Sequence, residues 1–129
     1  MRDLICLGML ALLLACTSPT AHDGTVKLKW TATGDDGHDG VAAEYDLRFS
    51  LSPITEANFL DATRTIPPDF PTPGPDGTVE RTSIEGLTVG STYYFAAKVR
   101  DSSWNWSAMS NVLEVDGVSP AALVLELDI

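Results

Sequence analysis

Three stretches of alternating apolar and polar residues constrain the fold of this chain more than any other feature. They cover residues 25–31, 43–51 and 92–100. Successive side chains of a β-strand point to opposite faces, so each stretch predicts a strand with one buried and one wet face. The residues expected to face inward are Val26, Leu28 and Trp30, then Tyr45, Leu47, Phe49 and Leu51, then Tyr93, Phe95, Ala97 and Val99.

Two sheets of such strands have to cover each other's apolar faces, which predicts an all-β fold and an antiparallel β-sandwich. After the first fifteen residues, a helix is expected only as one short turn at 53–58. A length of 129 residues allows one domain.

The charge of the chain limits its partners. Eighteen acidic residues against eight basic ones give a formal net charge of -10. Such an acidic surface argues against nucleic acid as a partner and against a head that lies flat on an anionic bilayer. It is typical of a soluble, monomeric head, and it permits calcium.

The amino-terminal segment predicts export. Residues 4–15 form an apolar run, which is too short to span a bilayer, a task that takes roughly 20 residues, and has the length of a signal-peptide core. The run ends in Leu13-Leu14-Ala15-Cys16, which resembles the lipobox of bacterial lipoproteins. The resemblance implies that residues 1–15 are a signal peptide and that Cys16 is lipidated, with palmitate among the acyl chains. The alternative is an ordinary signal peptide with a chance cysteine near its end.

Lipidation at Cys16 would make the lipid bilayer the first partner of the protein. Residues 16–24 then read as a lipidated tether, which spans at most roughly 30 Å at about 3.3 Å per residue. Thr17 stands where an Asp retains lipoproteins in the inner membrane of Gram-negative bacteria, so the predicted location is the cell envelope, lipid-anchored to the outer membrane. The other cysteine, Cys6, lies inside the signal segment, and the mature chain has no disulfide.

Residues 25–117 resemble an immunoglobulin-like fold of the fibronectin type III family. The motifs that carry the resemblance are Trp30 in an early strand, Tyr45-Asp-Leu-Arg48, Ile84-Glu-Gly-Leu87, and Tyr93-Tyr-Phe-Ala-Ala-Lys-Val-Arg100. Leu87 followed six residues later by Tyr93 matches the tyrosine corner, in which the phenol bonds back to the main chain. The resemblance implies that Trp30 fills the space between the sheets.

A bacterial subset of that family is similar in more detail. The shared motifs are Trp30-Thr-Ala-Thr-Gly-Asp-Asp-Gly37, Ser52-Pro-Ile54, and Asn105-Trp-Ser107 ahead of Ser110-Asn-Val112. The chain departs from the family pattern at both ends: the tether leaves little room for a first strand, and the tail 118–129 runs past the usual last one. One hypothesis is that this tail adds a strand and covers the edge that the missing strand would leave open.

Residues 65–78 contain five of the eight prolines and predict an exposed loop or at most an edge strand. A loop of this length is uncommon unless it is functional or mobile.

An Asp- and Gly-rich cluster, residues 34–40, is a candidate metal site. Asp35, Asp36 and Asp39 could supply the oxygen ligands that calcium prefers. The favoured alternative is a tight turn between two strands, where Asp and Gly are the default residues. A transition metal held by His38 with the same aspartates is a weaker alternative.

Two tryptophans lie in what reads as a loop after the strand at 92–100. Trp106 matches the tryptophan of the bacterial subset, which implies packing. Trp104 has no such counterpart and is either an exposed platform for a sugar ring or a peptide, or partly buried under its loop.

No motif for catalysis is recognisable. The expected function is therefore a non-enzymatic interaction module that binds a surface polysaccharide or protein, without a required cofactor. The alternative is a structural or accessory subunit of an envelope protein complex, with calcium as a stabilising ion.

Overall fold

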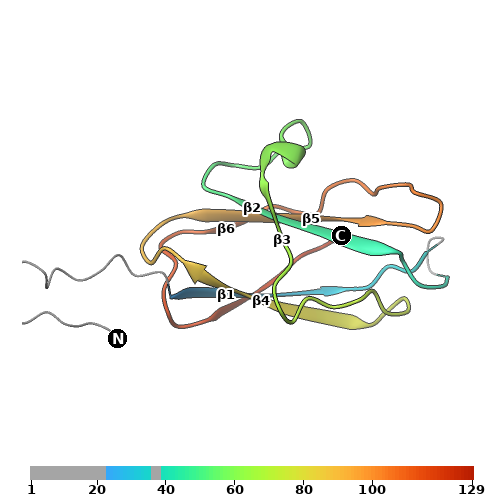
Figure 1. The fold of residues 1–129 in the computed structure, drawn as a ribbon, viewed down its shortest axis with the longest axis horizontal. Helices are drawn as coiled ribbons and strands as arrows, with labels where there is room; N and C mark the ends of the chain where they lie inside the picture. Colours follow the sequence, from blue (N-terminus) through green and yellow to red (C-terminus); the bar gives the residue numbers. More distant parts are fainter. Residues whose placement is uncertain (1–22, 36–38) are drawn as a thin grey trace, which may run out of the picture.

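Two β-sheets packed face to face form the body of the protein, which the computed structural model describes over residues 23–35 and 39–129 (Figure 1). A three-stranded sheet has the order β4-β1-β7, and a four-stranded sheet has the order β3-β2-β5-β6. The strands are β1 (Gly24–Thr31), β2 (Glu44–Ser50), β3 (Thr63–Thr65), β4 (Val79–Leu87), β5 (Tyr93–Arg100), β6 (Leu113–Val115) and β7 (Leu123–Glu126). The prediction of an all-β chain with two packed sheets is confirmed. The signal peptide, Cys16 and most of the tether lie outside the described residues.

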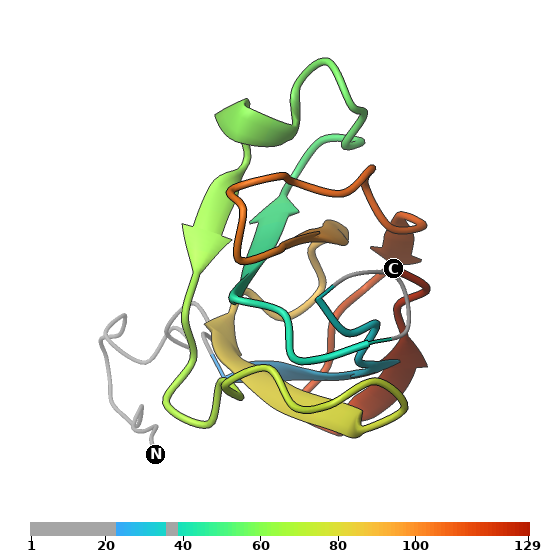
Figure 2. The ribbon, with the colours of Figure 1, turned by 90° about the vertical axis from the view of Figure 1, so that its right-hand side faces the viewer.

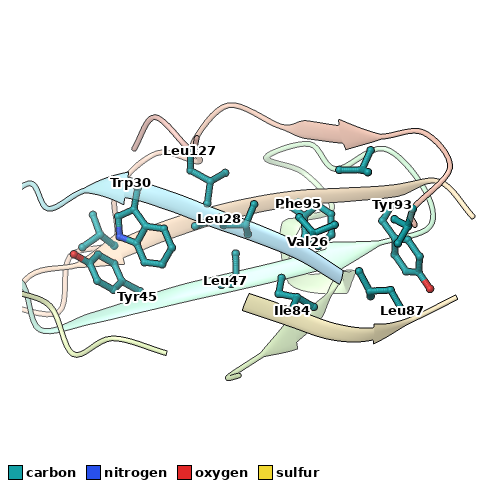
Figure 3. Close-up of a cluster of buried hydrophobic side chains, with 14 of the residues drawn as sticks. Val26, Leu28, Trp30, Tyr45, Leu47, Ile84, Leu87, Tyr93, Phe95 and Leu127 are labelled. Atoms are coloured by element: carbon teal, nitrogen blue, oxygen red, sulfur yellow. The ribbon is translucent and has the colours of Figure 1, made fainter. Parts of the chain in front are cut away.

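The inner faces of the strands form one hydrophobic core between the sheets (Figure 3). On β1, Val26, Leu28 and Trp30 are each at most 1% exposed, as their alternation predicts. The Trp30 ring meets the Tyr45 ring edge to face, with centroids 5.1 Å apart. Burial of roughly 150–250 Å² by each large aromatic makes this pair a main source of hydrophobic stabilisation at its end of the core.

The opposite end of the core is closed by a tyrosine. Tyr93 is 7% exposed, and its hydroxyl oxygen accepts a hydrogen bond of 3.0 Å from the Thr88 backbone N–H. Leu87, just before that turn, is 4% exposed. This bond joins the turn after β4 to the first residue of β5, and it has the geometry that the sequence motif predicts.

Part of the outer face of the four-stranded sheet is buried, so the prediction that this face is exposed to solvent is wrong there. Ala96 and Asp46, both expected to face solvent, are 0% and 4% exposed. Residues 51–62 fold back over this face and place Ile54 and Phe59 against Ala96 in a second, smaller core. The Phe59 ring in turn lies under the charged ends of Arg48 and Lys98, at 5.2 and 4.9 Å.

Two further details of the same region differ from expectation. The helical turn predicted at 53–58 is instead the 3-10 helix η2 (Phe59–Asp61), which forms where Phe59 anchors the chain to the sheet. Leu51, expected to face inward, is 66% exposed because β2 ends at Ser50 and the chain turns away from the core.

The proline-rich segment 65–78 forms a strap along one lateral side of the sandwich. Phe70 packs against Trp30 and Tyr45, with ring centroids 6.2 and 6.4 Å away. The Asp69 carboxylate accepts hydrogen bonds from the Ser83 backbone N–H and from Thr82 Oγ1, and these donors, Ser83 first, hold the pKa of Asp69 below its usual range. The exposed edge of β4 is thus partly capped, which discourages pairing with another chain.

A buried carboxylate connects this strap to the core. Glu80, on β4, is 6% exposed and accepts hydrogen bonds from the Tyr45 hydroxyl at 3.0 Å and the Gly74 backbone N–H at 2.8 Å. Burial, together with the neighbouring carboxylate, raises the pKa of Tyr45 far above its usual value. The segment is therefore an integral part of the sandwich and not a free loop.

The carboxyl-terminal tail supplies β7, which pairs with the free edge of β1. The pairing is parallel, with Val26 opposite Leu123 and Lys29 opposite Glu126, so the small sheet is mixed and not purely antiparallel. Leu127 follows the strand, is 2% exposed, and its backbone N–H donates to the Lys29 carbonyl at 2.8 Å. Asn111 bonds to the backbone at Glu126 and Asp128 and ties this edge to the opposite sheet.

Leu127→Ala is expected to lower the free energy of unfolding by about 2–5 kcal/mol, because it empties a filled site in the core. Leu123→Ala, in the same tail at a residue that is 51% exposed, is the matched control and should change stability by about 0.5 kcal/mol or less. Chemical denaturation of both variants measures the difference. Equal, small effects would mean that the tail is not part of the folded core.

Candidate functional site

Loops that follow β1 and β5 come together at one end of the sandwich. β1 begins at Gly24 at the left-hand end of Figure 1, whereas β5 ends at Arg100 at the right-hand end. The loop 101–106 and the turn after Thr31 lie at this right-hand end, which Figure 2 views directly. The most exposed aromatic side chain among the described residues, Trp104, therefore lies at the end opposite to the one where β1 begins.

Trp104 presents an open ring face. Its side chain is 73% exposed, and the Arg100 guanidinium carbon lies 3.8 Å from the ring centroid. Its backbone has φ of 69°, a conformation that residues other than glycine seldom adopt. With one face against Arg100, the indole is held in place and leaves its other face free. The sequence allows Trp104 to be either exposed or partly buried under its loop, and in the structure it is exposed.

A row of charged groups fixes Arg100. Its Nε donates to Glu44 at 2.9 Å, and Arg64 donates to the other oxygen of the same carboxylate at 2.7 Å. Hydrogen bonds from Arg64, then Arg100, lower the pKa of Glu44. These contacts run across β3, β2 and β5, so the sheet itself sets the position of the guanidinium that supports Trp104.

Asp101 organises the loop that carries Trp104. Its carboxylate accepts hydrogen bonds from the backbone N–H groups of Ser103 and Asn105 and from Asn105 Nδ2, at 2.8 to 3.1 Å. The Asn105 backbone bond is the largest of the interactions that hold the pKa of Asp101 below its usual range. The carboxylate thus closes a compact turn around the exposed indole.

Asp35 joins this loop to the Asp- and Gly-rich turn. Its two carboxylate oxygens accept bonds from Ser102 N and Ser102 Oγ, both at 2.7 Å. Of the predicted calcium ligands, Asp39 is exposed and its carbonyl bonds to Asp35 N, while Asp36, like His38, lies outside the described residues. Residues 23–35 and 39–129 contain no cluster of three metal-ligating side chains, so calcium binding here stays a prediction.

A hollow of about 290 Å³ lies beside the Trp104 loop. Its lining includes Asp35, Arg100, Asn105 and Trp106. Trp106 is 42% exposed, its backbone pairs with Arg100 through an isolated β-bridge, and the Arg100 guanidinium carbon lies 6.0 Å from its ring centroid, so the ring is partly packed and partly open. The remaining predicted structural residues, Trp30, Leu87 and Tyr93, belong to the core and not to this surface.

A larger groove, of about 760 Å³, lies on the lateral side between residues 65–69 and the edge of β4. Its lining includes no aromatic side chain, whereas Trp106 lines the hollow beside the Trp104 loop, and Asp69 already occupies the backbone donor of Ser83 in the groove. The end surface with the two tryptophans is therefore the better candidate for ligand binding.

Sequence reasoning missed the residues that hold Trp104 in place. The alternation at residues 92–100 predicts that Arg100 faces solvent, and the sequence pattern predicts no role for Glu44 or Asp101. A pattern that could have identified Arg100 is a basic residue at an outward position near a strand end, four residues before a tryptophan with no assigned role. A cation placed there can stack on the indole face.

Comparisons of the chain with protein-family models, curated proteins and solved structures find no match. Among the described residues, no helix has the length and apolar character needed to cross a membrane.

The amides of Ser103 and Asn105 are expected to titrate with Asp101, at a midpoint below the usual Asp value of about 3.9. Because the folded-state pKa is lowered, the loop contacts add stability above that value and lose it as the pH falls through the folded-state pKa. NMR titration of the two amide shifts measures the midpoint. Asp101→Asn should abolish the transition, and a wild-type midpoint at or above 3.9 would contradict the assignment.

Proposed function

We propose that this protein is a lipid-anchored lipoprotein of the cell envelope whose β-sandwich is a non-enzymatic module for binding a surface polysaccharide. The observation that carries the proposal is the open ring of Trp104, held by Arg100 at the end of the sandwich far from Gly24. The motif ending in Cys16 supports the anchor. A tether at one end and an aromatic platform at the other would present the platform away from the membrane.

A fibronectin type III relationship belongs to the same proposal. The strand order, the buried Trp30 between the sheets and the hydrogen bond from Thr88 N–H to the Tyr93 hydroxyl support it. The departure is at one edge, where β7 pairs in parallel with β1 in the place that a first strand would otherwise take. Such sandwiches commonly use their end loops for binding, which agrees with the position of Trp104.

A saccharide is favoured over a protein partner by the shape and composition of the surface. The Trp104 indole offers a flat apolar face, and Asn105 and Trp106, which line the hollow beside its loop, add an amide and an indole N–H for hydrogen bonds. Rigid aromatic rings with a few polar neighbours are the usual makeup of small-ligand sites. The hollow is small and open, which suits single sugar units of a chain.

The anchor is tested by metabolic labelling of cells with radioactive palmitate. Wild-type protein should incorporate the label, and Cys16→Ser should not, since the thioether carries the lipid. Cys6→Ser is the matched control, because that residue lies within the signal segment, and it should label like wild type. Equal labelling of Cys16→Ser and wild type would remove the anchor from the proposal.

The binding surface is tested by glycan-array and affinity measurements on Trp104→Ala. Truncation of an anchoring tryptophan should weaken binding about tenfold or more. Leu60→Ala, which changes another apolar residue that is 76% exposed, is the control and should bind like wild type. Saccharide binding that survives in Trp104→Ala would contradict the assigned surface. Co-purification of an envelope protein, with no saccharide bound, would favour the accessory-subunit alternative.

A further inference from the structure

The backbone at Trp104 adopts a conformation that its surroundings have to hold in place. Its φ of 69° lies in the left-handed region, which a residue with a bulky side chain seldom adopts. Such a conformation costs free energy and persists only where the surrounding contacts enforce it. These contacts therefore decide whether the indole stays on Arg100, whose guanidinium carbon lies 3.8 Å from the ring centroid.

Contacts between neighbours along the chain explain the shape of the loop. The Trp104 backbone N–H donates to the Asp101 carbonyl at 3.2 Å. At the base of the loop, the Ser107 backbone N–H donates to the Val99 carbonyl of β5 at 2.8 Å. The first bond closes the turn and the second seats its base on the sheet. Neither bond involves Ser102, which lies two residues before the tryptophan.

Ser102 is held by a different connection of the sandwich. The two oxygens of the Asp35 carboxylate accept from its backbone N–H and from its Oγ, each at 2.7 Å. Two bonds between the same two residues fix the orientation of Ser102 as well as its position, and bonds to an ionised acceptor are roughly twice as strong as neutral ones. Asp35 follows β1 and Ser102 follows β5, so this contact joins loops from both sheets.

The turn that contains Asp35 restrains this side chain. The Asp35 backbone N–H donates to the Asp39 carbonyl at 2.6 Å. Gly40 has φ of 74°, and a Cβ at that position would lie 3.2 Å from the Cβ of Asp35. A larger residue at position 40 would therefore be strained and would crowd the aspartate. The glycine and the aspartates of this turn thus have a structural use that needs no metal ion.

We infer that Asp35 is a positioning residue of the saccharide-binding surface: through Ser102 it keeps the Trp104 ring stacked on its supporting guanidinium, with the outer face open. The inference rests on the proposed function, because it gives this contact a part in ligand affinity. Apparent affinity falls in proportion to the fraction of molecules that have the binding-competent conformation. Asp35 keeps that fraction high and so strengthens binding without touching the sugar.

The position of the ring is tested first without a ligand, by NMR order parameters of the indole Nε1–H groups in the full chain. In the wild type, the exposed Trp104 ring is expected to be nearly as ordered as Trp30, which is 1% exposed. Asp35→Ala should lower the order parameter of Trp104 below about 0.6, the range of flexible groups. The value for Trp30 should not change, which would show that the core persists.

Variants of the donor residue separate this contact from a general effect on the loop. Ser102→Ala removes the Oγ donor and should loosen the Trp104 ring in part, whereas Ser102→Thr keeps both donors and should retain the wild-type order. Ser103→Ala is the matched control and should also retain it. That neighbouring serine is exposed too, and its hydrogen bond within the described residues is made by its backbone N–H.

The effect on affinity is measured by titration with chitohexaose, an uncharged hexamer of N-acetylglucosamine. Asp35→Ala is expected to bind it about tenfold more weakly, as when about one molecule in ten has the competent loop. The loss should appear in the association rate constant, because only competent molecules bind, whereas loss of a direct contact mostly changes the dissociation rate constant. In a Trp104→Ala background, Asp35→Ala should weaken binding no further.

The outcomes separate the two proposals. An unchanged order parameter for Trp104 in Asp35→Ala would overturn the inference, whether or not a saccharide binds. A loosened ring that still binds chitohexaose as tightly as the wild type would also overturn it and leave saccharide binding in place. Failure of the wild type to bind chitohexaose would overturn the role in affinity. If the glycan array is blank as well, the proposed function fails, even where the order parameters show that Asp35 holds the ring.

Discussion

The structure depends on strand β1 being paired along both of its edges while its apolar face is buried. Val26, Leu28 and Trp30 fill the space between the sheets, and β1 pairs with β4 along its length, from Gly24 opposite Leu87 to Thr31 opposite Val79. The odd-numbered residues face the other edge, where Lys29 O accepts from Leu127 N and Thr25 N donates to Ser119 O. Without β7 this second edge would expose unpaired backbone groups beside the core, which is costly and invites association.

The tail matters for stability because residues 23–129 contain no cysteine, so no disulfide holds the sandwich together. A single sandwich of about a hundred residues then has to rely on its hydrophobic core and on the segments that close its sides. One side is closed by the strap 65–78, with Phe70 on the core and Glu80 bonded to Gly74. The other is closed by Asn111, which bridges to residues 126–128. The end carrying Trp104 is thereby held by a rigid frame.

The sequence predicts the strands well where alternation reports directly on burial. Val26, Leu28 and Trp30 on β1 and Tyr93, Phe95, Ala97 and Val99 on β5 all face inward as expected. Alternation fails for Asp46 and Ala96, because the pattern of one strand carries no information about a distant segment that covers its outer face. Phe59 belongs to the segment that covers this face, and no residue close to Ala96 in the sequence predicts the contact. Alternation fails for Leu51 because β2 ends at Ser50.

The candidate site was partly predictable for the same reason. An unassigned tryptophan in an end loop, Trp104, is visible in the sequence, but its support is not. Arg100, Glu44 and Arg64 come from three strands that only the folded sheet brings side by side. Spacing alone also gives no indication that the Asp35 carboxylate accepts hydrogen bonds from Ser102, in a loop 67 residues away. Tertiary contacts of this kind leave no local pattern.

Native-state hydrogen exchange along β1 tests the claim that β7 completes the small sheet. The Lys27 and Lys29 amides face β7, whereas the Leu28 and Trp30 amides face β4. The account predicts that all four are protected in the folded chain, because both edges are paired. Rapid exchange of Lys27 and Lys29 alongside protected Leu28 and Trp30 would show that the β7 edge is open, and would contradict it.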